Sequence, residues 1–330
     1  MEGIPVLEPV VLASNRPAPR FYRGGRRITD FRGDPAAGDF EPEDWIGSTT
    51  TVAGHDTLGL TVLPDGRTLA DAISAGPLGW LGAEHVARFG ADTRLLVKLL
   101  DPGQRLPVHA HPSAAWATEH VARAHGKVEA WFILSPGVVH LGLRTDVSDA
   151  DLHELVAAQD TAGLVALLNT VDVVAGDVVL VPAGVLHAIG EGVLLVELQE
   201  PEDLSILLEW RGFELDGERD GHLGVGFDLA LTAVDHHALT ADRLAELVRP
   251  AGYGSVFPAE ADEFFRLERV AVEDTATLAP GFAILVVVSG EVRLGDLSLP
   301  RGRTVVVPNA AGPIVLTGDG EVLACRPPAS

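Results

Sequence analysis

Two short histidine motifs place the strongest limits on how this chain of 330 residues can fold and what it can bind. The first runs from Gly103 to His111 and reads Gly-x5-His-x-His. The second runs from Gly176 to His187 and reads Gly-x5-Pro-x-Gly-x2-His. Glu129 lies between them in the sequence. Three imidazoles and one carboxylate suit a divalent ion such as Zn²⁺, Mn²⁺, Fe²⁺, Ni²⁺ or Co²⁺, with Zn²⁺ the leading candidate.

The spacing within the motifs is typical of a metal site built on β-strands. Side chains alternate between the two faces of a strand, so His109 and His111 point the same way and lie roughly 6–7 Å apart along it. Gly184 favours a turn, and Pro182 fits a strand end. A single His-x-His motif would also fit ordinary pocket residues. The second motif favours a shared ion, with His109, His111, Glu129 and His187 as its ligands.

Composition narrows the classes of partner. The chain has 47 acidic residues against 24 basic ones and a net charge of −23, which argues against nucleic acid and anionic membranes. A single cysteine excludes an internal disulfide framework. The first residues lack the basic and apolar regions of a signal peptide, and we find no run of about 20 apolar residues. We therefore expect a cytoplasmic protein that binds a small molecule.

The basic residues are unevenly distributed. Residues 7–32 carry six arginines, which either form a solvated basic loop or bring one or two guanidinium groups to an anionic substrate. The chain has only two lysines, Lys98 and Lys127, and both flank the first motif. They are candidates for a titratable amine in the site. Lys98 could also extend its amine from a strand end without any role in the site.

Short apolar runs with Gly and Pro turns predict a mainly β fold. We expect a metal-binding domain over residues 1–250, with a helical insertion at about 148–170, and a smaller β domain over residues 256–330. No histidine follows His237, so the second domain is expected to serve structure or homodimer formation. The expected strands include Trp45–Thr51, Leu58–Leu63 and Leu204–Trp210, and the expected helices begin at Thr68, Ser113 and Thr240.

The two motifs match the two halves of the cupin signature, and the chain resembles the short bacterial class I mannose-6-phosphate isomerases over nearly its whole length. Leu95–Leu100 is similar to the family's Leu-Leu-Val-Lys-Ile-Leu, and Gly126–Glu129 stands where it has Gly-Lys-Thr-Glu. His109–Pro112 stands where the family has Gln-Val-His-Pro. Pro182–Ile189 is close to Pro-Ala-Gly-x-x-His-Ala-Ile, and Arg20–Gly25 resembles a Trp-Gly-Gly loop.

The resemblance implies two cupin jelly-roll barrels, a zinc ion, and interconversion of an aldose phosphate with its ketose through an enediol. It also implies that His109 replaces a glutamine ligand. The arginine thought to be catalytic in the family falls on Leu207, and Arg211 is expected on the same strand face four residues later. This departure predicts weak turnover of mannose 6-phosphate and a preference for an unphosphorylated or smaller sugar.

The chemistry also follows from the residues. A divalent ion polarises a sugar carbonyl and stabilises an enediolate, while a nearby base moves the proton between carbons. The candidate bases are Lys127, Glu197, Glu209 or water held by the metal. We assign catalytic roles to Lys127, Arg211 and Glu209, and substrate binding to Lys98, Trp45 and Arg20.

Two other functions remain open at this point. One is a different cupin metalloenzyme, either an iron dioxygenase or a relative of the epimerases. The other is a sugar-binding cupin without catalytic activity. An O₂-dependent enzyme would need Fe²⁺ and oxygen, whereas the isomerase would work anaerobically. A sugar-binding cupin without catalytic activity would bind the sugar but would exchange no solvent deuterium into it.

Overall fold

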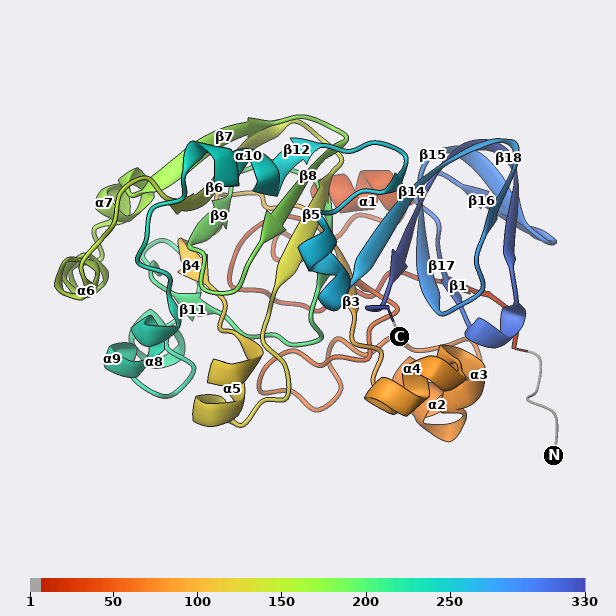
Figure 1. The fold of residues 1–330 in the computed structure, drawn as a ribbon, viewed down its shortest axis with the longest axis horizontal. Coiled ribbons are helices and arrows are strands. Elements are labelled where there is room, and N and C mark those ends of the chain that lie inside the picture. The colour runs from red at the N-terminus through yellow and green to blue at the C-terminus, as the bar shows by residue number, and fades with distance from the viewer. Residues whose placement is uncertain (1–6, 330) are drawn as a thin grey trace.

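The computed structural model describes residues 7–329, which form three antiparallel sheets side by side along the long axis of the molecule (Figure 1). The six-stranded sheet in the middle has the order β12-β8-β5-β10-β3-β2. Its strands are β2 (Glu43–Ile46), β3 (Leu96–Leu100), β5 (Glu129–Ile133), β8 (Asp177–Val181), β10 (Leu195–Gln199) and β12 (Val248–Pro250).

The five-stranded sheet faces the middle sheet on one side and has the order β11-β4-β9-β6-β7. Its strands are β4 (His109–Ala110), β6 (Gly137–Leu143), β7 (Leu168–Val173), β9 (His187–Ile189) and β11 (Ile206–Leu207). These two sheets make the first barrel. Histidine and glutamate side chains from opposite sheets can therefore meet inside it.

The seven-stranded sheet lies at the other end and curls into the second barrel (Figure 1). Its order is β1-β17-β15-β18-β14-β13, with β16 paired to β15. Its strands are β1 (Val10–Leu12), β13 (Gly254–Ser255), β14 (Arg266–Leu278), β15 (Ala283–Leu294), β16 (Leu297–Pro300), β17 (Thr304–Val307) and β18 (Ile314–Arg326). The N-terminal strand β1 pairs with β17, so both ends of the chain contribute to this sheet.

Helices connect and cover the barrels. The α-helices are α1 (Arg26–Arg32), α2 (Leu69–Ala75), α3 (Pro77–Leu81), α4 (Ala83–Phe89), α5 (Ala114–Val121), α6 (Asp149–Ala158), α7 (Thr161–Ala166), α8 (Gly217–Asp220), α9 (Phe227–Ala230) and α10 (Ala241–Leu247). Short 3-10 helices are η1 (Leu231–Ala233), η2 (Ala259–Glu263) and η3 (Asn309–Ala311). No helix within residues 7–329 is both long and apolar enough to cross a bilayer.

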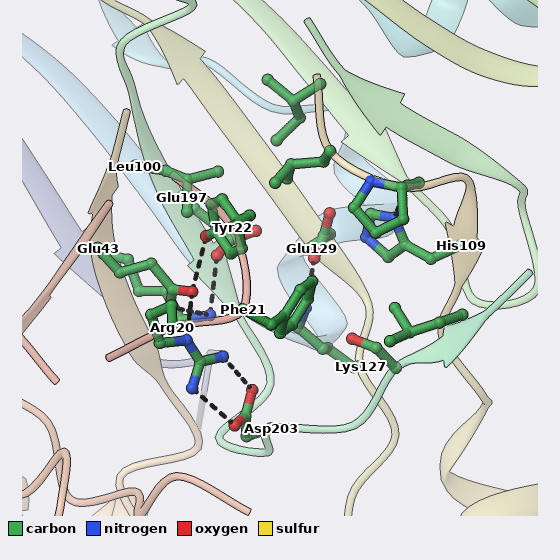
Figure 2. Close-up of a pocket in the computed structure, with 16 residues that line it drawn as sticks. Arg20, Phe21, Tyr22, Glu43, Leu100, His109, Lys127, Glu129, Glu197 and Asp203 are labelled. Atoms are coloured by element: carbon green, nitrogen blue, oxygen red, sulfur yellow. Dashed lines mark hydrogen bonds and ion pairs between the residues drawn. The ribbon is translucent and has the colours of Figure 1, made fainter. Parts of the chain in front are cut away.

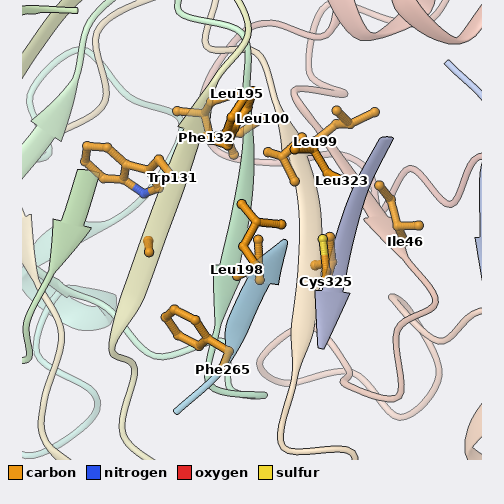
Figure 3. Close-up of a cluster of buried hydrophobic side chains, with 14 of the residues drawn as sticks. Ile46, Leu99, Leu100, Trp131, Phe132, Leu195, Leu198, Phe265, Leu323 and Cys325 are labelled. Carbon is orange, nitrogen blue, oxygen red and sulfur yellow. The ribbon is translucent and has the colours of Figure 1, made fainter. Parts of the chain in front are cut away.

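Strands of the middle sheet are buried along their whole length because both faces are covered. β3, β5 and β10 are fully buried, and their sequences are almost continuously apolar. One apolar cluster joins Leu99 and Leu198 of the middle sheet to Phe265, Leu323 and Cys325 of the second barrel (Figure 3). The two barrels therefore share a core.

Several sequence-based expectations match the structure. The mainly β fold of two antiparallel barrels is confirmed. Helices α2, α5 and α10 begin after Thr68, Ser113 and Thr240, and each of these side chains accepts a hydrogen bond from a backbone N–H three residues later. Helices α6 and α7 occupy the segment expected to be a helical insertion.

Other expectations were wrong. Leu58–Leu63 is irregular because Gly59 adopts φ +102°, and a Cβ there would lie 2.8 Å from the Trp45 ring. β2 ends at Ile46, and β11 contains only two of the residues expected in a strand over Leu204–Trp210. The basic N-terminal segment is not a solvated loop throughout. It contains α1, whose Arg32 is buried and lies 3.1 Å from Asp44.

Candidate active site

Three histidine side chains meet inside the first barrel. His109 on β4 and His187 at the start of β9 are directly paired across the two strands, and His111 follows β4 on the same face. Their ring centroids lie 4.0–4.9 Å apart. One ring nitrogen from each lies within 4.8 Å of the others. The sheet register therefore brings the two sequence motifs together.

Glu129 approaches the histidines from the opposite sheet, at the start of β5. Its Oε2 atom lies 3.1 Å from His111 Nε2, and its Oε1 atom lies 3.1 Å from His187 Nε2. All four of these side chains are buried. The structure thus brings together His109, His111, Glu129 and His187, the four residues that the sequence predicted as ligands.

Backbone carbonyl groups fix the orientation of the three imidazoles. The Nδ1–H groups of His109, His111 and His187 donate to the carbonyl oxygens of Pro107, Leu204 and Val185 at 2.7–2.9 Å. Each Nε2 is then left with a lone pair, as metal ligands require. Burial, reinforced by the Lys127 ammonium, lowers the pKa of His111 to about 3, and burial likewise lowers the pKa of His109.

These groups fit a cation. Neutral Nε2 atoms and carboxylate oxygens are both hydrogen-bond acceptors, and two acceptors 3.1 Å apart repel unless a positive charge or a proton lies between them. His187 Nε2 has no hydrogen-bond partner among residues 7–329. Burial would raise the pKa of Glu129, but Lys127 and His111 hold it well below its usual value. The donor set suits a borderline divalent ion.

The Lys127 ammonium provides a positive charge at this point in the structure. Its Nζ atom lies 3.0 Å from Glu129 Oε2 (Figure 2). It also lies 2.9 Å from His111 Nε2. A divalent ion held by these two ligands would compete with the ammonium for the same lone pairs. Lys127 would then move toward the cavity that it already lines.

A second set of charges lines the same cavity. Arg20 pairs with Glu43 at 2.8 Å and with Asp203 at 3.3 Å (Figure 2). Lys98 pairs with Glu197 at 3.2 Å and with Glu43 at 3.5 Å. The predicted substrate-binding residues Arg20 and Lys98 do reach the cavity, and both enter it as members of ion pairs.

The carboxylates in this network differ in pKa. Burial raises the pKa of Glu43, but Arg20 and Lys98 outweigh it and lower the value to about 2. Burial raises the pKa of Glu197 to about 7, because Lys98 compensates only partly and Glu129 adds a repulsive charge. Glu197 is thus the carboxyl group of the cavity that can carry a proton near neutral pH.

Three of the predicted site residues lie away from the cavity. Arg211 is exposed and its Nη2 donates to the Ala158 carbonyl at 3.4 Å, because β11 ends at Leu207 and the chain turns away. Glu209 forms a bidentate ion pair with Arg105 at 2.7–2.8 Å and accepts from Val108 N–H. Neither residue lines the cavity, so their positions do not support the predicted catalytic roles.

Trp45, which was predicted to bind substrate, also lies outside the lining of the cavity. Its ring is fully buried behind the cavity wall, where Nε1–H donates to Glu43 Oε2 at 2.7 Å and the Lys98 ammonium lies 5.0 Å from the ring centroid. Trp45 therefore orients the two charged groups and does not itself line the cavity. The sequence reading missed Glu43, Tyr22 and Asp203. Tyr22 lies in the segment Arg20–Gly25 but was given no role, whereas Glu43 and Asp203 belong to no motif. Only the tertiary fold brings the three residues to the site.

The remaining wall of the cavity is apolar. It includes Phe21, Leu100, Leu106, Ile189 and Leu207. Leu207 on β11 lies directly opposite His109 on β4. The free space is about 50 Å³, so only the reacting end of a small ligand fits without movement of the walls.

Comparisons with known proteins agree with this architecture, although no protein-family model matches the sequence. A curated mannose-6-phosphate isomerase from Streptococcus mutans is 31% identical over 185 residues, 54% of each chain. The match thus spans about half of the length of that relative. A protein from Archaeoglobus fulgidus, solved as a candidate mannosephosphate isomerase, superposes with a TM-score of 0.78 at 20% identity over 99% of this chain and 100% of its own.

A third relative carries metal. A mannose 6-phosphate isomerase bound with zinc and yttrium superposes with a TM-score of 0.75 at 17% identity, covering 98% of this chain and 100% of that one. The relatives in sequence and in fold are thus mannose-6-phosphate isomerases, as the resemblance of the motifs indicated. At these identities, the structural matches establish the fold.

Proposed function

From the kinship of sequence and fold with mannose-6-phosphate isomerases, we propose that this chain is a metal-dependent aldose–ketose isomerase that acts on a sugar or a sugar phosphate. The observation that carries the proposal is the convergence of three imidazoles and one carboxylate beside a small cavity. A purely structural cluster would pair donors with acceptors, whereas these groups present acceptors to one another.

The residues that would hold the ion are His109, His111, Glu129 and His187, and the proposed ion is Zn²⁺. When bound, it supplies a Lewis acid that polarises the sugar carbonyl. The Nδ1–H bonds to backbone carbonyls fix the tautomer and the orientation of the imidazoles for this task. Cavity walls built from Leu207, Ile189 and Phe21 limit the access of water.

The isomerisation moves protons and leaves the composition of the sugar unchanged. A base removes the proton on C2 as the C2–H bond breaks, and the protonated base, whose proton exchanges with solvent, delivers a proton to C1 as a C1–H bond forms. The O2 hydroxyl proton passes to O1, so C1 is reduced while C2 is oxidised. We assign the carbon proton to a carboxylate oxygen of Glu197, and we assign to Lys127 Nζ a hydrogen bond that stabilises negative charge on O1 or O2.

Deuterium uptake tests the reaction itself. We expect the Zn²⁺-loaded protein to exchange solvent deuterium into C1 and C2 of at least one sugar when a panel of aldoses and aldose phosphates is followed by NMR in D₂O. The exchange should continue without oxygen and disappear in Glu129→Gln. A metal-loaded protein that binds sugar but exchanges no deuterium would contradict the proposal.

Substitutions separate the two proposed roles. Glu197→Gln should lower kcat by about 100-fold or more with little change in KM, because it removes the group that accepts the carbon proton. Lys127→Met should lower kcat and leave exchange at C2 detectable. The matched control is Glu209→Gln, a buried carboxylate outside the cavity. Loss of kcat in this control without loss of folding would contradict the assignment.

A further inference from the structure

The charges around the cavity point to a class of substrate. We propose that the site takes an unphosphorylated aldose and its ketose, and that it discriminates against sugar phosphates. This inference rests on the proposed isomerase function. It concerns the end of the sugar away from the reacting carbons, where a phosphate group carries nearly two negative charges at neutral pH.

Every cation that lines the cavity already has a carboxylate partner. Arg20 lies between Glu43 and Asp203, and Lys98 lies between Glu43 and Glu197. Lys127 pairs with Glu129 here, and in the metal-loaded site it is assigned to the reacting oxygens O1 and O2, away from the far end of the sugar. These side chains are almost completely buried, so a phosphate would have to break a short, desolvated ion pair to obtain a partner.

The balance of charge in the cavity is unfavourable for a second anion. Away from the proposed metal ligands and Lys127, three carboxylates, Glu43, Glu197 and Asp203, line it against Arg20 and Lys98. The charge of a divalent ion at the histidines would be offset by Glu129 and by the negative charge that develops on the reacting oxygens. The net charge of −23 over the whole chain adds a long-range repulsion of anions.

The wall beside the metal ligands is mainly apolar, and the Ser205 hydroxyl that also lines it carries no charge to offer a phosphate. Leu207 stands opposite His109 across β11 and β4, and its side chain faces the cavity. Together with Leu100, Leu106 and Ile189 it makes an apolar surface. A sugar ring presents C–H groups on one face and hydroxyl groups at its edge. The apolar wall suits the first, and the paired carboxylates and ammonium groups suit the second.

The two depressions next to the cavity differ in their balance of charge. One shares Arg20 and Phe21 with the cavity and adds Arg23, which lies over the Phe40 ring, together with Glu214. The other shares Asp203 and adds Asp56 and Glu202, against Arg123 alone. Among the described residues that line these depressions, Arg23 is the cation without an ion-pair partner, and it is exposed. Arg23 is therefore the cation that a phosphate group could pair with at the lowest cost.

The test compares two ligands on the same Zn²⁺-loaded protein. We expect kcat/KM for mannose to exceed that for mannose 6-phosphate by about tenfold or more, and calorimetry to show tighter binding of the neutral sugar or its reduced analogue mannitol. If another neutral aldose in the panel is the preferred substrate, the same ratio is measured against its own phosphate. A tenfold preference for the phosphate would overturn the inference.

Two variants should raise the preference for the phosphate by different routes, one by adding a cation and the other by removing a carboxylate. Leu207→Arg places a new guanidinium beside the metal ligands, and Asp203→Asn releases Arg20 from one of its two carboxylates. Each should move the ratio toward the phosphate by about tenfold, because each supplies a donor for it. Leu207→Met and Glu202→Gln are the matched controls. The second removes one negative charge at the neighbouring residue without touching Arg20.

The possible failures are distinguishable. If no sugar exchanges deuterium but calorimetry still shows preferred binding of the neutral sugar, the isomerase function is wrong and the inference stands. If mannose 6-phosphate is preferred and Arg23→Gln abolishes that preference, the inference is wrong and the function stands. If neither ligand binds the folded, Zn²⁺-loaded protein, both are wrong.

Discussion

The two barrels of this protein are built from the same kind of antiparallel strands but are filled differently. The inside of the first barrel holds buried histidines, carboxylates, an arginine and lysines around a cavity. The cluster inside the second barrel is aliphatic throughout, with Leu285, Val287, Val305 and Leu316 fully buried. A packed interior stabilises a barrel. A polar interior is stable only when its buried polar groups are paired, but it provides the charged side chains and the cavity that a reaction needs.

The largest expected effect tests whether metal binding is confined to the first barrel. His187→Ala should abolish stoichiometric Zn²⁺ binding and lower turnover by more than about 100-fold. Even mutation of a residue that only hydrogen-bonds to a metal ligand lowers metal affinity or activity by up to about 100-fold. Bound metal is measured by elemental analysis after gel filtration. His140→Ala is the control, because His140 lies on β6 outside the histidine cluster. Retention of full Zn²⁺ occupancy in His187→Ala would contradict the ligand assignment.

The next prediction concerns the core that joins the barrels. Phe265→Ala should reduce the free energy of unfolding by about 3–5 kcal/mol, because Phe265 is fully buried in the apolar cluster shared by both barrels (Figure 3). Denaturant unfolding is followed by fluorescence and by circular dichroism. The two probes should report a single transition. Separate transitions for wild-type protein would show that the barrels unfold independently.

Leu285→Ala makes the matching change inside the second barrel. Leu285 is fully buried in the aliphatic cluster, so its truncation should cost about 2–5 kcal/mol. Zn²⁺ stoichiometry and KM should stay at the wild-type values, because no residue of this cluster lines the cavity. A change in KM without a change in fold would mean that the second barrel reaches the site.

The same contrast explains how much the sequence could predict. The four proposed metal ligands were predicted from sequence. Strand alternation and fixed spacings place the three histidines on one face, and Glu129, which comes from the opposite sheet, was found in the segment Gly126–Glu129. The carboxylates that neutralise Arg20 and Lys98 were not found, since Glu43 and Asp203 come from separate segments and meet only in the folded barrel. Arg211 was misplaced because a strand of two residues was taken to continue for four more.

The prediction for Glu43 concerns pH. Its pKa of about 2 lies below the ordinary 4.5, so the folded state is stabilised above pH 4.5 and loses this contribution as the pH falls toward 2. We expect the difference in unfolding free energy between wild type and Glu43→Gln to shrink by about 3 kcal/mol over that range. Asp65→Asn, at the exposed pair with Arg67, is the control and should leave the pH dependence near that of wild type. Equal slopes for wild type and Glu43→Gln would contradict the ion-pair account.

The smallest expected effect concerns the helices that link the two barrels. Thr68 accepts the backbone N–H of Asp71 at 3.0 Å and so caps α2, whose Leu69 and Ile73 are buried in the shared core. Next to α2, α3 contacts η3 of the second barrel. Thr68→Ala should lower the free energy of unfolding by about 1 kcal/mol, the usual cost of a lost N-cap.

Ser148→Ala is the matched change, because Ser148 caps α6 in the same way at the far end of the first barrel (Figure 1). Both variants should lose similar stability in global unfolding. They should differ in hydrogen exchange: Thr68→Ala should accelerate amide exchange in α2 and α3, beside the second barrel, whereas Ser148→Ala should accelerate it in α6 and α7. Identical exchange patterns would show that the caps act on the whole molecule and that α2 does not belong to the link between the barrels.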